Sequence, residues 1–216
     1  MVKAMHSKAK PKRGRPVNER RREEIVACAT CLFMKNGLHA TTMDSIARDL
    51  GISKLTLYSR FKNKDALFFA VIAAKANEYV PDSLFKEFHD RAIEESLYRI
   101  GYGMMRLVTS DDAVNMERML MAAAKTNRNI TKLFYEAGPT RMRREIAARL
   151  EALHCEGKLH VPDPLTSTYM FLSLFKGSEI CLRIKMNIPP KPTKQQMQDY
   201  CREAVSMFML AHAPRK

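Results

Sequence analysis

The amino-acid sequence predicts an all-α protein of about nine helices. Apolar residues recur at spacings of three and four along almost the whole chain, which is the period of an amphipathic helix. Alternating apolar runs never exceed a few residues, so strand signals are almost absent. Capping residues, glycines and prolines separate the periodic segments, and no internal repeat is evident.

Four helices are expected in the first 80 residues, each bounded by residues that favour a helix end. The first runs from about Glu19 to Lys35 and stops at Asn36-Gly37, because glycine readily closes a helix. The second and third are short, and the fourth runs from Lys64 to about Tyr79. Side chains that can accept a bond from a free backbone N–H precede the last three helices: Thr42, Ser53 and Asn63.

The rest of the chain reads as about five longer helices. Asp163-Pro164 begins one that is expected to reach Lys185, because aspartate caps a helix and proline suits its first turn. Thr193 and Gln196 form a capping box that begins the last helix, which ends near His212. Breaks between helices are expected at Ser110-Asp111, Gly138-Pro139, Gly157 and the proline-rich stretch 189–192.

Positive charge is concentrated in the N-terminal part of the chain. The 216 residues include 37 Lys and Arg and 23 Asp and Glu, which gives a net charge of +14. Residues 1–64 hold 15 of the basic residues and only 5 of the acidic ones. This asymmetry indicates a surface for a polyanion, although a basic run alone fits a solubilising tail equally well.

Cysteine usage and hydropathy indicate the compartment. The 5 cysteines are scattered, odd in number and accompanied by no secretory signal, so we expect free thiols in the cytoplasm. No apolar run reaches the ~18 residues that a membrane span requires, so we expect no membrane partner.

The segment from Thr41 to Phe61 has the spacing of a helix-turn-helix, with two short helices around residues 50–53. If Leu57 and Phe61 are buried, the second helix turns outward the donors and hydroxyls of Lys54, Thr56, Ser59 and Arg60. Such groups suit base edges and phosphates. An ordinary helical hairpin with a solvated face is the alternative. The basic N-terminal arm (residues 1–17), the tight turn and the absence of acidic residues in the third helix together favour DNA binding.

A longer, ordered set of residues carries a family resemblance. Its members are Phe33 to Gly37, Thr41-Thr42, Ile46-Ala47, Gly51-Ile52-Ser53, Thr56-Leu57-Tyr58 and Phe61 to Leu67. With this set, residues 25–71 resemble the DNA-binding domain of the TetR family of bacterial repressors. Residues 141–150, 156–159 and 163–164 show a looser similarity to the ligand-binding halves of the family. Leu55 stands where the family usually has Gly or Pro, and Arg60 where it usually has Tyr or His, so the operator cannot be inferred from a relative.

The resemblance implies a homodimeric transcriptional regulator, most often a repressor that a small-molecule effector releases from a palindromic operator in double-stranded DNA. We divide the chain into a basic arm (1–17), a helix-turn-helix domain (18–64) and a helical ligand-binding and dimerisation domain (65–216). The free N–H groups that begin the helix at Lys64 also favour a phosphate. The expected DNA contacts are Arg13, Arg15, Thr42, Ser45, Lys54, Leu55, Thr56, Tyr58, Ser59, Arg60 and Lys64.

Residues 11–16, Pro-Lys-Arg-Gly-Arg-Pro, resemble the core of an AT-hook. Gly14 lets an extended backbone lie deep in a narrow minor groove, while Arg13 and Arg15 run along it. Narrow grooves occur in A-tracts, so the arm is expected to favour AT-rich flanks. Non-specific attraction to phosphates is the alternative.

Two more sites are expected in the C-terminal half. Met side chains adapt to irregular apolar ligands, although for any single Met core filling is the alternative. The candidate residues of an apolar effector pocket are Met104, Met116, Met119 and Phe175. The resemblance also implies that helices 163–185 and 193–212 pair across a two-fold axis, packing within one subunit being the alternative. The candidate interface residues are Met170, Leu174, Met197, Tyr200, Ala204 and Phe208.

The sequence shows no catalytic constellation, and we expect no enzyme, cofactor or metal site. Cys28 and Cys31 share a helix face, but zinc needs two further ligands at matching spacing. Gly157 separates His154 from His160. The rival to a regulator is an architectural protein of AT-rich DNA that has no effector.

Overall fold

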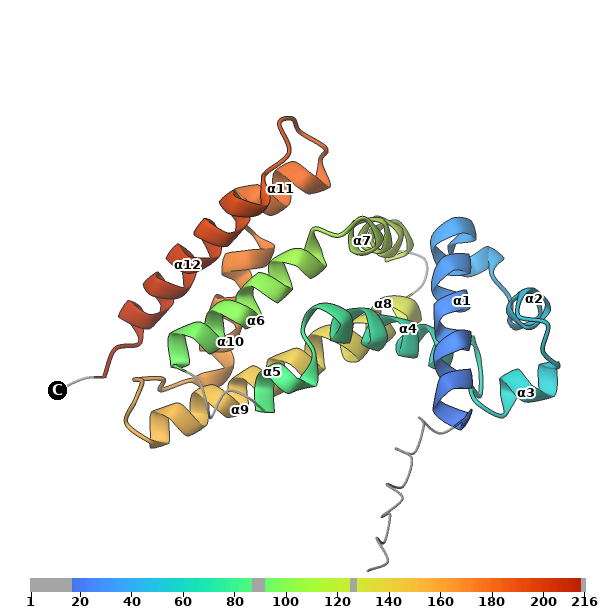
Figure 1. Cartoon of the computed structure of the whole chain (residues 1–216), viewed down its shortest axis with the longest axis horizontal. Coiled ribbons are helices and arrows are strands. Elements are labelled where there is room, and N and C mark those ends of the chain that lie inside the picture. The colour runs from blue at the N-terminus through green and yellow to red at the C-terminus, as the bar shows by residue number, and fades with distance from the viewer. Residues whose placement is uncertain (1–16, 87–91, 125–127, 215–216) are drawn as a thin grey trace, which may run out of the picture.

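The computed structural model describes residues 17–86, 92–124 and 128–214, and these residues are helical without a strand, as the sequence predicts. Figure 1 shows α1 to α3 at one end of the molecule and α12, which leads to the C-terminus, at the other. Within the described part of the chain, no helix has both the length and the apolar character needed to cross a bilayer.

Three helices form the first end of the molecule: α1 (Val17–Ala40), α2 (Met43–Asp49) and α3 (Lys54–Tyr58). Their core contains Phe33, Ile46 and Leu57, each almost completely buried. Gly37 interrupts α1 with a φ of 78°, close to the end that the sequence predicts. The three helices therefore pack around a small apolar core, and α3 lies at the surface of the unit.

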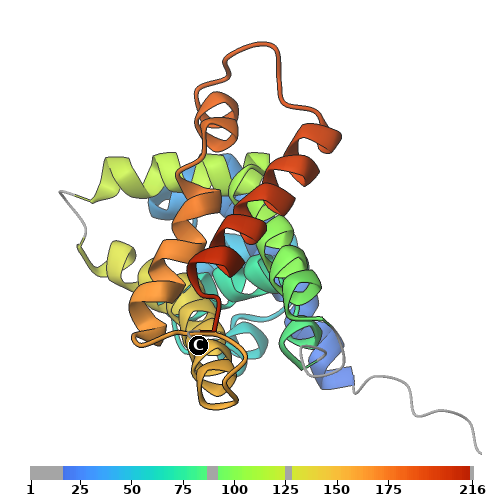
Figure 2. The ribbon, with the colours of Figure 1, turned by 90° about the vertical axis from the view of Figure 1, so that its left-hand side faces the viewer.

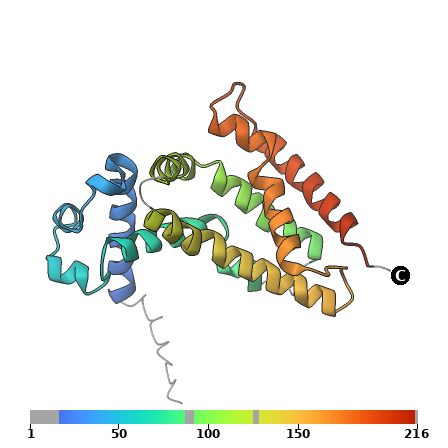
Figure 3. The same cartoon turned by 180° about the vertical axis from the view of Figure 1, so that it is seen from behind.

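The fourth helix, α4 (Lys64–Tyr79), has the bounds that the sequence predicts. It packs against α1 and continues into the body of the molecule, where it contacts α6, α8 and a π-helix (Figure 3). The apolar core around α1 to α4 also contains Met116, Leu120 and Ala137 from the body. The two expected domains thus share one packed core across the boundary proposed at residue 64.

The body consists of helices that follow α4 in the chain. They are α5 (Asp82–Lys86), α6 (Ile93–Val108), α7 (Asp111–Ala123), α8 (Arg128–Tyr135), the π-helix Glu136–Thr140, α9 (Arg141–Cys155), α10 (Pro164–Lys176), α11 (Glu179–Lys185) and α12 (Lys194–Ala211). Phe171 lies at the centre of their core, with its ring centroid 5.1 Å from that of Phe175 and 5.0 Å from that of Phe208. Figure 2 shows α10 and α12 together on the face that lies away from α1 to α3.

Two expected helix boundaries are wrong. The predicted break at Gly138-Pro139 is a π-helix that joins α8 to α9, and the Thr140 hydroxyl donates to the Tyr135 carbonyl at 2.9 Å. A widened turn accommodates proline, which lacks an N–H and crowds the preceding turn. The predicted helix 163–185 is divided into α10 and α11, because Gly177 ends the first and the Ser178 hydroxyl caps the second.

Candidate DNA interface and ligand cavity

Side-chain caps hold the helix-turn-helix in shape, at the positions that the sequence predicts. Thr42 and Ser45 form a capping box at the start of α2. The Thr56 N–H donates to the Ser53 side chain at 3.0 Å, which begins α3. A cap of this kind contributes about 1 kcal/mol to stability. Gly51 has a φ of 62° in the turn, a conformation that glycine adopts at least cost.

The exposed side of α3 carries most of the expected DNA contacts. Leu55 is 81% exposed and Tyr58 46% exposed, and Lys54, Ser59 and Arg60 are exposed as well. Neither the Tyr58 hydroxyl nor the Arg60 guanidinium bonds to another described residue. These side chains are therefore available to a partner that approaches α3 from solvent.

Other candidates on this surface already have partners. Lys54 Nζ lies 2.6 Å from Asp44 Oδ2, which links α3 to α2. Thr56 is half-buried, and its hydroxyl shares a 2.8 Å bond with that of Ser53. The Ser59 hydroxyl donates to the Thr56 carbonyl at 2.8 Å. Contacts from these residues to DNA would have to supplement or exchange the bonds that they make in the chain.

Lys64 differs from the expectation of a phosphate-facing charge. Its ammonium is half-buried and donates to the Leu38 carbonyl at 2.8 Å and to the Thr41 carbonyl at 3.1 Å. These carbonyls lie in the last turn of α1 and directly after it, where backbone acceptors lack helical partners. In the structure, the Lys64 ammonium therefore forms hydrogen bonds within the protein. Arg13 and Arg15, the expected minor-groove residues, lie outside the described residues.

The body contains a mostly apolar cavity of about 250 Å³. Residues of α1 and α4 form part of its wall, and residues of α6, α7, α8, the π-helix, α9, α10 and α11 form the rest. Met104 and Met116 line it, as expected. Met119 instead packs against the core around α1 to α4, and Phe175 is completely buried beside Gly101. For these two residues the expectation of a pocket position is wrong, because their side chains fill the core between helices.

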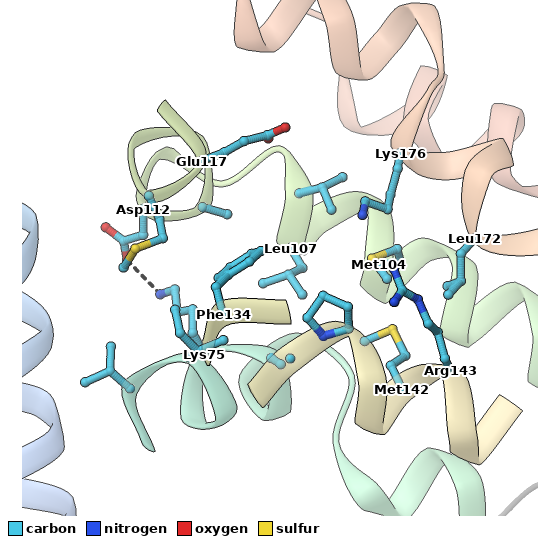
Figure 4. A pocket seen from close by; sticks show the side chains of 18 of the residues that line it. Lys75, Met104, Leu107, Asp112, Glu117, Phe134, Met142, Arg143, Leu172 and Lys176 are labelled. Carbon is cyan, nitrogen blue, oxygen red and sulfur yellow. Dashed lines mark ion pairs between the residues drawn. The ribbon is translucent and has the colours of Figure 1, made fainter. Parts of the chain in front are cut away.

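Charged side chains also line the cavity, and the sequence reasoning missed them. Four are basic and two are acidic: Lys75, Arg143, Lys176, Lys185, Asp112 and Glu117. Figure 4 shows Lys75 and Asp112 at one end, with Arg143 and Lys176 converging at the other, beside Met104. Lysine at the end of the apolar run 169–175 was the available signal, but its direction could not be read from the sequence.

Two of the lysines are held by carboxylates. Lys75 Nζ lies 2.8 Å from Asp112 Oδ2 and 3.0 Å from Glu78 Oε2. Burial lowers the pKa of Lys75, but the hydrogen bonds to Asp112 and Glu78 outweigh it and the pKa is raised. Lys185 Nζ lies 2.7 Å from Glu117 Oε2. Both pairs tie α7 to another helix at the cavity wall.

The exposure of residues on α10 and α12 shows which of the expected interface residues are accessible to a second subunit. Met170 is 60% exposed, but Ala204 is only 5% and Phe208 only 3% exposed, because both belong to the core of the subunit. Leu174, Met197 and Tyr200 are half-buried, and the Tyr200 hydroxyl donates to the Leu174 carbonyl at 2.6 Å. The expectation that Ala204 and Phe208 face a second subunit is therefore wrong. Other exposed apolar residues of these two helices are Leu165, Tyr169, Met207 and Leu210.

The cysteines and the described acidic residues form no cluster that could hold a metal ion. All 5 cysteines are free thiols, and burial raises the pKa of the Cys201 thiol to about 12. A thiol with a raised pKa is a poor nucleophile. Among the described residues, no group of three or more His, Cys, Asp or Glu is placed to hold a metal ion.

An exposed α3 in a capped helix-turn-helix, joined through α4 to a helical body with a cavity, defines a helix-turn-helix transcriptional regulator. Residues 95–214, more than half of the chain, match the C-terminal domain of AefR-like transcriptional repressors. Residues 25–71 match the bacterial regulatory proteins of the tetR family. The chain therefore belongs to the TetR family.

Individual relatives agree with this assignment. The chain is 29% identical to the HTH-type transcriptional regulator UidR of Escherichia coli K12 over 138 residues, which are 61% of this chain and 65% of UidR. The chain thus spans slightly less than two thirds of that relative.

Two solved structures show the same fold over most of the chain. A protein from Mesorhizobium loti assigned to the TetR family has a TM-score of 0.72 and 21% identity. The Flavonoid-responsive Regulator FrrA has a TM-score of 0.69 and 28% identity. The likeness covers 92% of this chain and 100% of each of those chains.

Proposed function

We propose that this protein binds a palindromic operator as a homodimer and that a small molecule in the cavity weakens this binding, so that it acts as a repressor. The observation that carries the proposal is the composition of the cavity wall. Thr30 and Met34 come from α1, and Val71, Ile72 and Lys75 come from α4. A ligand in the cavity would thus contact α1 and α4, the helices that precede and follow the helix-turn-helix.

The coupling follows from the path of α4. This helix begins at Lys64, three residues after Phe61 of the helix-turn-helix core, and its later turns form part of the cavity wall. A ligand that fits one position of α4 better than another shifts the population of the two, and with it the position of α3. The ligand must bind the two arrangements with different affinity for any such shift to occur.

A homodimer gives this movement its effect on DNA. In a two-fold dimer, both recognition helices reach the major groove only if they are separated by about one helical turn, roughly 34 Å. Small rotations of the subunits change this separation and so change operator affinity. The exposed apolar residues of α10 and α12 provide a surface on which a second copy would bury Met170 and Leu210.

Several finer features belong to the same proposal. We infer that Leu55, Tyr58 and Arg60 contact base edges or phosphates, that the arm adds minor-groove contacts, and that the protein acts in the cytoplasm and is not an enzyme. FrrA, at 28% identity, is named as flavonoid-responsive. Flavonoids are therefore the first effectors to test.

The proposal is tested in two steps with the full-length protein. Fragments bound from random DNA should contain one palindrome, and its affinity should exceed that of random DNA by at least about 1,000-fold at physiological salt. At least one compound of a panel of apolar metabolites, beginning with flavonoids, should weaken binding to that palindrome in a gel shift. Enrichment of AT-rich DNA without a shared palindrome would instead support an architectural protein.

A further inference from the structure

The charges of the cavity are unevenly distributed. Lys75 and Lys185 each pair with a carboxylate, whereas no described carboxylate forms an ion pair with Arg143 or Lys176. Figure 4 shows these two side chains entering from α9 and α10 and approaching one another at the same end of the cavity. Two cations close together in a mostly apolar cavity repel one another, and Glu117 offsets only part of that repulsion.

The surroundings of both cations favour an anionic partner. Burial around the Lys176 ammonium and the neighbouring positive charges of Arg143 and Lys185 lower its pKa, although the residue as a whole is exposed to solvent. The Arg143 guanidinium lies over the rings of Tyr135, at 4.3 Å, and Tyr169, at 5.2 Å. Its Nε is buried without a hydrogen-bond partner. A buried donor without an acceptor costs free energy, which a bound carboxylate would recover.

The wall beside these cations is apolar. Met104, Met142 and Leu172 lie beside the two charges, and Leu107 and Phe134 continue the apolar wall toward Lys75 (Figure 4). Thioether, aliphatic and aromatic groups of this kind accept a hydrocarbon or aromatic body without requiring hydrogen bonds. The site therefore combines an apolar volume with one positively charged end.

We propose that the effector is an amphipathic monocarboxylic acid whose apolar body lies against the methionine-rich wall and whose carboxylate lies between Arg143 and Lys176. This inference rests on the proposed function, since it names the chemical class of the ligand for the same cavity. It also distinguishes Arg143 and Lys176 from Lys75 and Lys185, whose charges are already matched by Asp112, Glu78 and Glu117.

A neutral fluorescent probe separates the cavity from its charge preference. N-phenyl-1-naphthylamine, which carries no charge, should bind the full-length protein, and three competitors with one hydrocarbon chain should displace it. They are decanoate, decan-1-ol and decylamine. Decanoate should bind about tenfold more tightly than decan-1-ol, because charge-assisted hydrogen bonds exceed neutral ones by that order. Decylamine, protonated at pH 7, should bind more weakly than the alcohol.

Matched variants assign the preference to residues. Lys176→Met and Arg143→Met keep most of the side-chain volume and remove the charge. Each should lower decanoate affinity to about that of decan-1-ol, with a much smaller change in the affinity for the alcohol and for the probe. The control is Arg144→Met, on the neighbouring residue of α9, whose side chain is 74% exposed and does not line the cavity. This control should retain the preference for decanoate.

The outcomes distinguish the two proposals. Probe binding with decanoate no tighter than decan-1-ol would overturn the anionic ligand and leave the apolar effector site standing. A preference lost equally in Arg144→Met would also overturn it, since the cause would be general surface charge. Failure of the probe and of all three competitors to bind the wild-type protein would overturn the effector site itself, and the anionic ligand with it.

Discussion

Lys64 closes the connection between α1 and α2 from the inside. Its two bonds reach the carbonyls of Leu38 and Thr41, and the Thr41 hydroxyl donates to the Gly37 carbonyl at 2.8 Å. Thr41 is completely buried, so these groups need partners within the chain. A charge next to the DNA-binding surface is thus used to build that surface. The capped start of α4 was predictable from Asn63, but the direction of a long, flexible side chain was not.

We predict that Lys64→Met lowers the free energy of unfolding by about 1–3 kcal/mol, because two buried carbonyls lose a charged donor. Chemical denaturation followed by circular dichroism measures this loss. The control is Lys62→Met, on an exposed neighbour, which should leave stability unchanged. If Lys64 instead contacted a phosphate, its replacement would leave stability intact and lower the salt slope of operator binding by about one.

Unlike Lys64, Arg60 is expected to affect operator binding and not the stability of the fold. Its guanidinium is exposed just beyond the end of α3 and bonds to no described residue. Arg60→Ala should weaken operator binding by about 1–3 kcal/mol, the usual contribution of one base or close phosphate contact, without changing the unfolding transition. Lys132→Ala, on α8 in the body, serves as the control in the same gel shift. Full operator affinity in a folded Arg60→Ala protein would place Arg60 outside the interface.

At the scale of elements, α4 and α6 meet backbone to backbone. A Cβ atom added at Gly103 would lie 2.4 Å from the Tyr79 carbonyl oxygen, at the end of α4. Two residues earlier, a Cβ atom at Gly101 would lie 2.3 Å from the Phe175 ring. Only glycine permits the approach of the Tyr79 carbonyl to Gly103, so the position of α4 against α6 depends on Gly103, whereas Gly101 makes room for Phe175 of α10.

We therefore predict that Gly103→Ala lowers the free energy of unfolding by about 1–3 kcal/mol, despite the higher helix propensity of alanine. Denaturant titration measures the change. Gly138→Ala is the matched control, since its Cβ atom would meet only the Ile72 methyl at 3.1 Å, which can move. A neutral or stabilising Gly103→Ala would show that α4 and α6 are less closely packed than described.

Local signals predicted most helix starts, because a cap depends on residues within one turn of itself. Ser110 and Asp163 begin α7 and α10 as expected. The sites were harder to predict, since they depend on how distant helices meet. Leu172 and Phe175 lie one turn apart on α10, yet Leu172 lines the cavity and Phe175 fills the core. No periodicity in the sequence separates two buried residues of one helix into these roles.

In the whole molecule, the exposed α3 and the face of α10 and α12, on which we propose dimerisation, lie at opposite ends (Figure 1). We predict that Met170→Glu combined with Leu210→Glu yields a folded monomer, because both side chains are exposed apolar groups of the α10 and α12 face. Light scattering should show half the mass of the wild-type assembly, and operator affinity should fall because two linked half-sites no longer act together. A variant that remains dimeric would exclude this face.

The buried neighbour on the same helix provides the contrast. Phe208→Glu would place a charge in the core beside Phe171, at a position that is 3% exposed. An unpaired buried charge costs several kcal/mol, so this variant should unfold rather than dissociate. Loss of the circular dichroism signal separates this result from that of the exposed variants.

The basic arm allows a prediction about the DNA that flanks the operator half-sites. Residues 1–16 lie outside the described residues, but Arg13, Gly14 and Arg15 have the composition of a minor-groove segment. Minor-groove insertion implies that deletion of residues 1–16 weakens binding more for operators with A-tract flanks than for operators with GC-rich flanks. The guanine amino group obstructs the groove floor, and GC-rich tracts lack the narrow width that concentrates negative potential.

Arg13→Ala with Arg15→Ala should reproduce most of this difference, whereas Lys3→Ala with Lys8→Ala should mainly lower the salt slope. Equal losses on the two operators in a gel shift would show that the arm acts only as a charged tether.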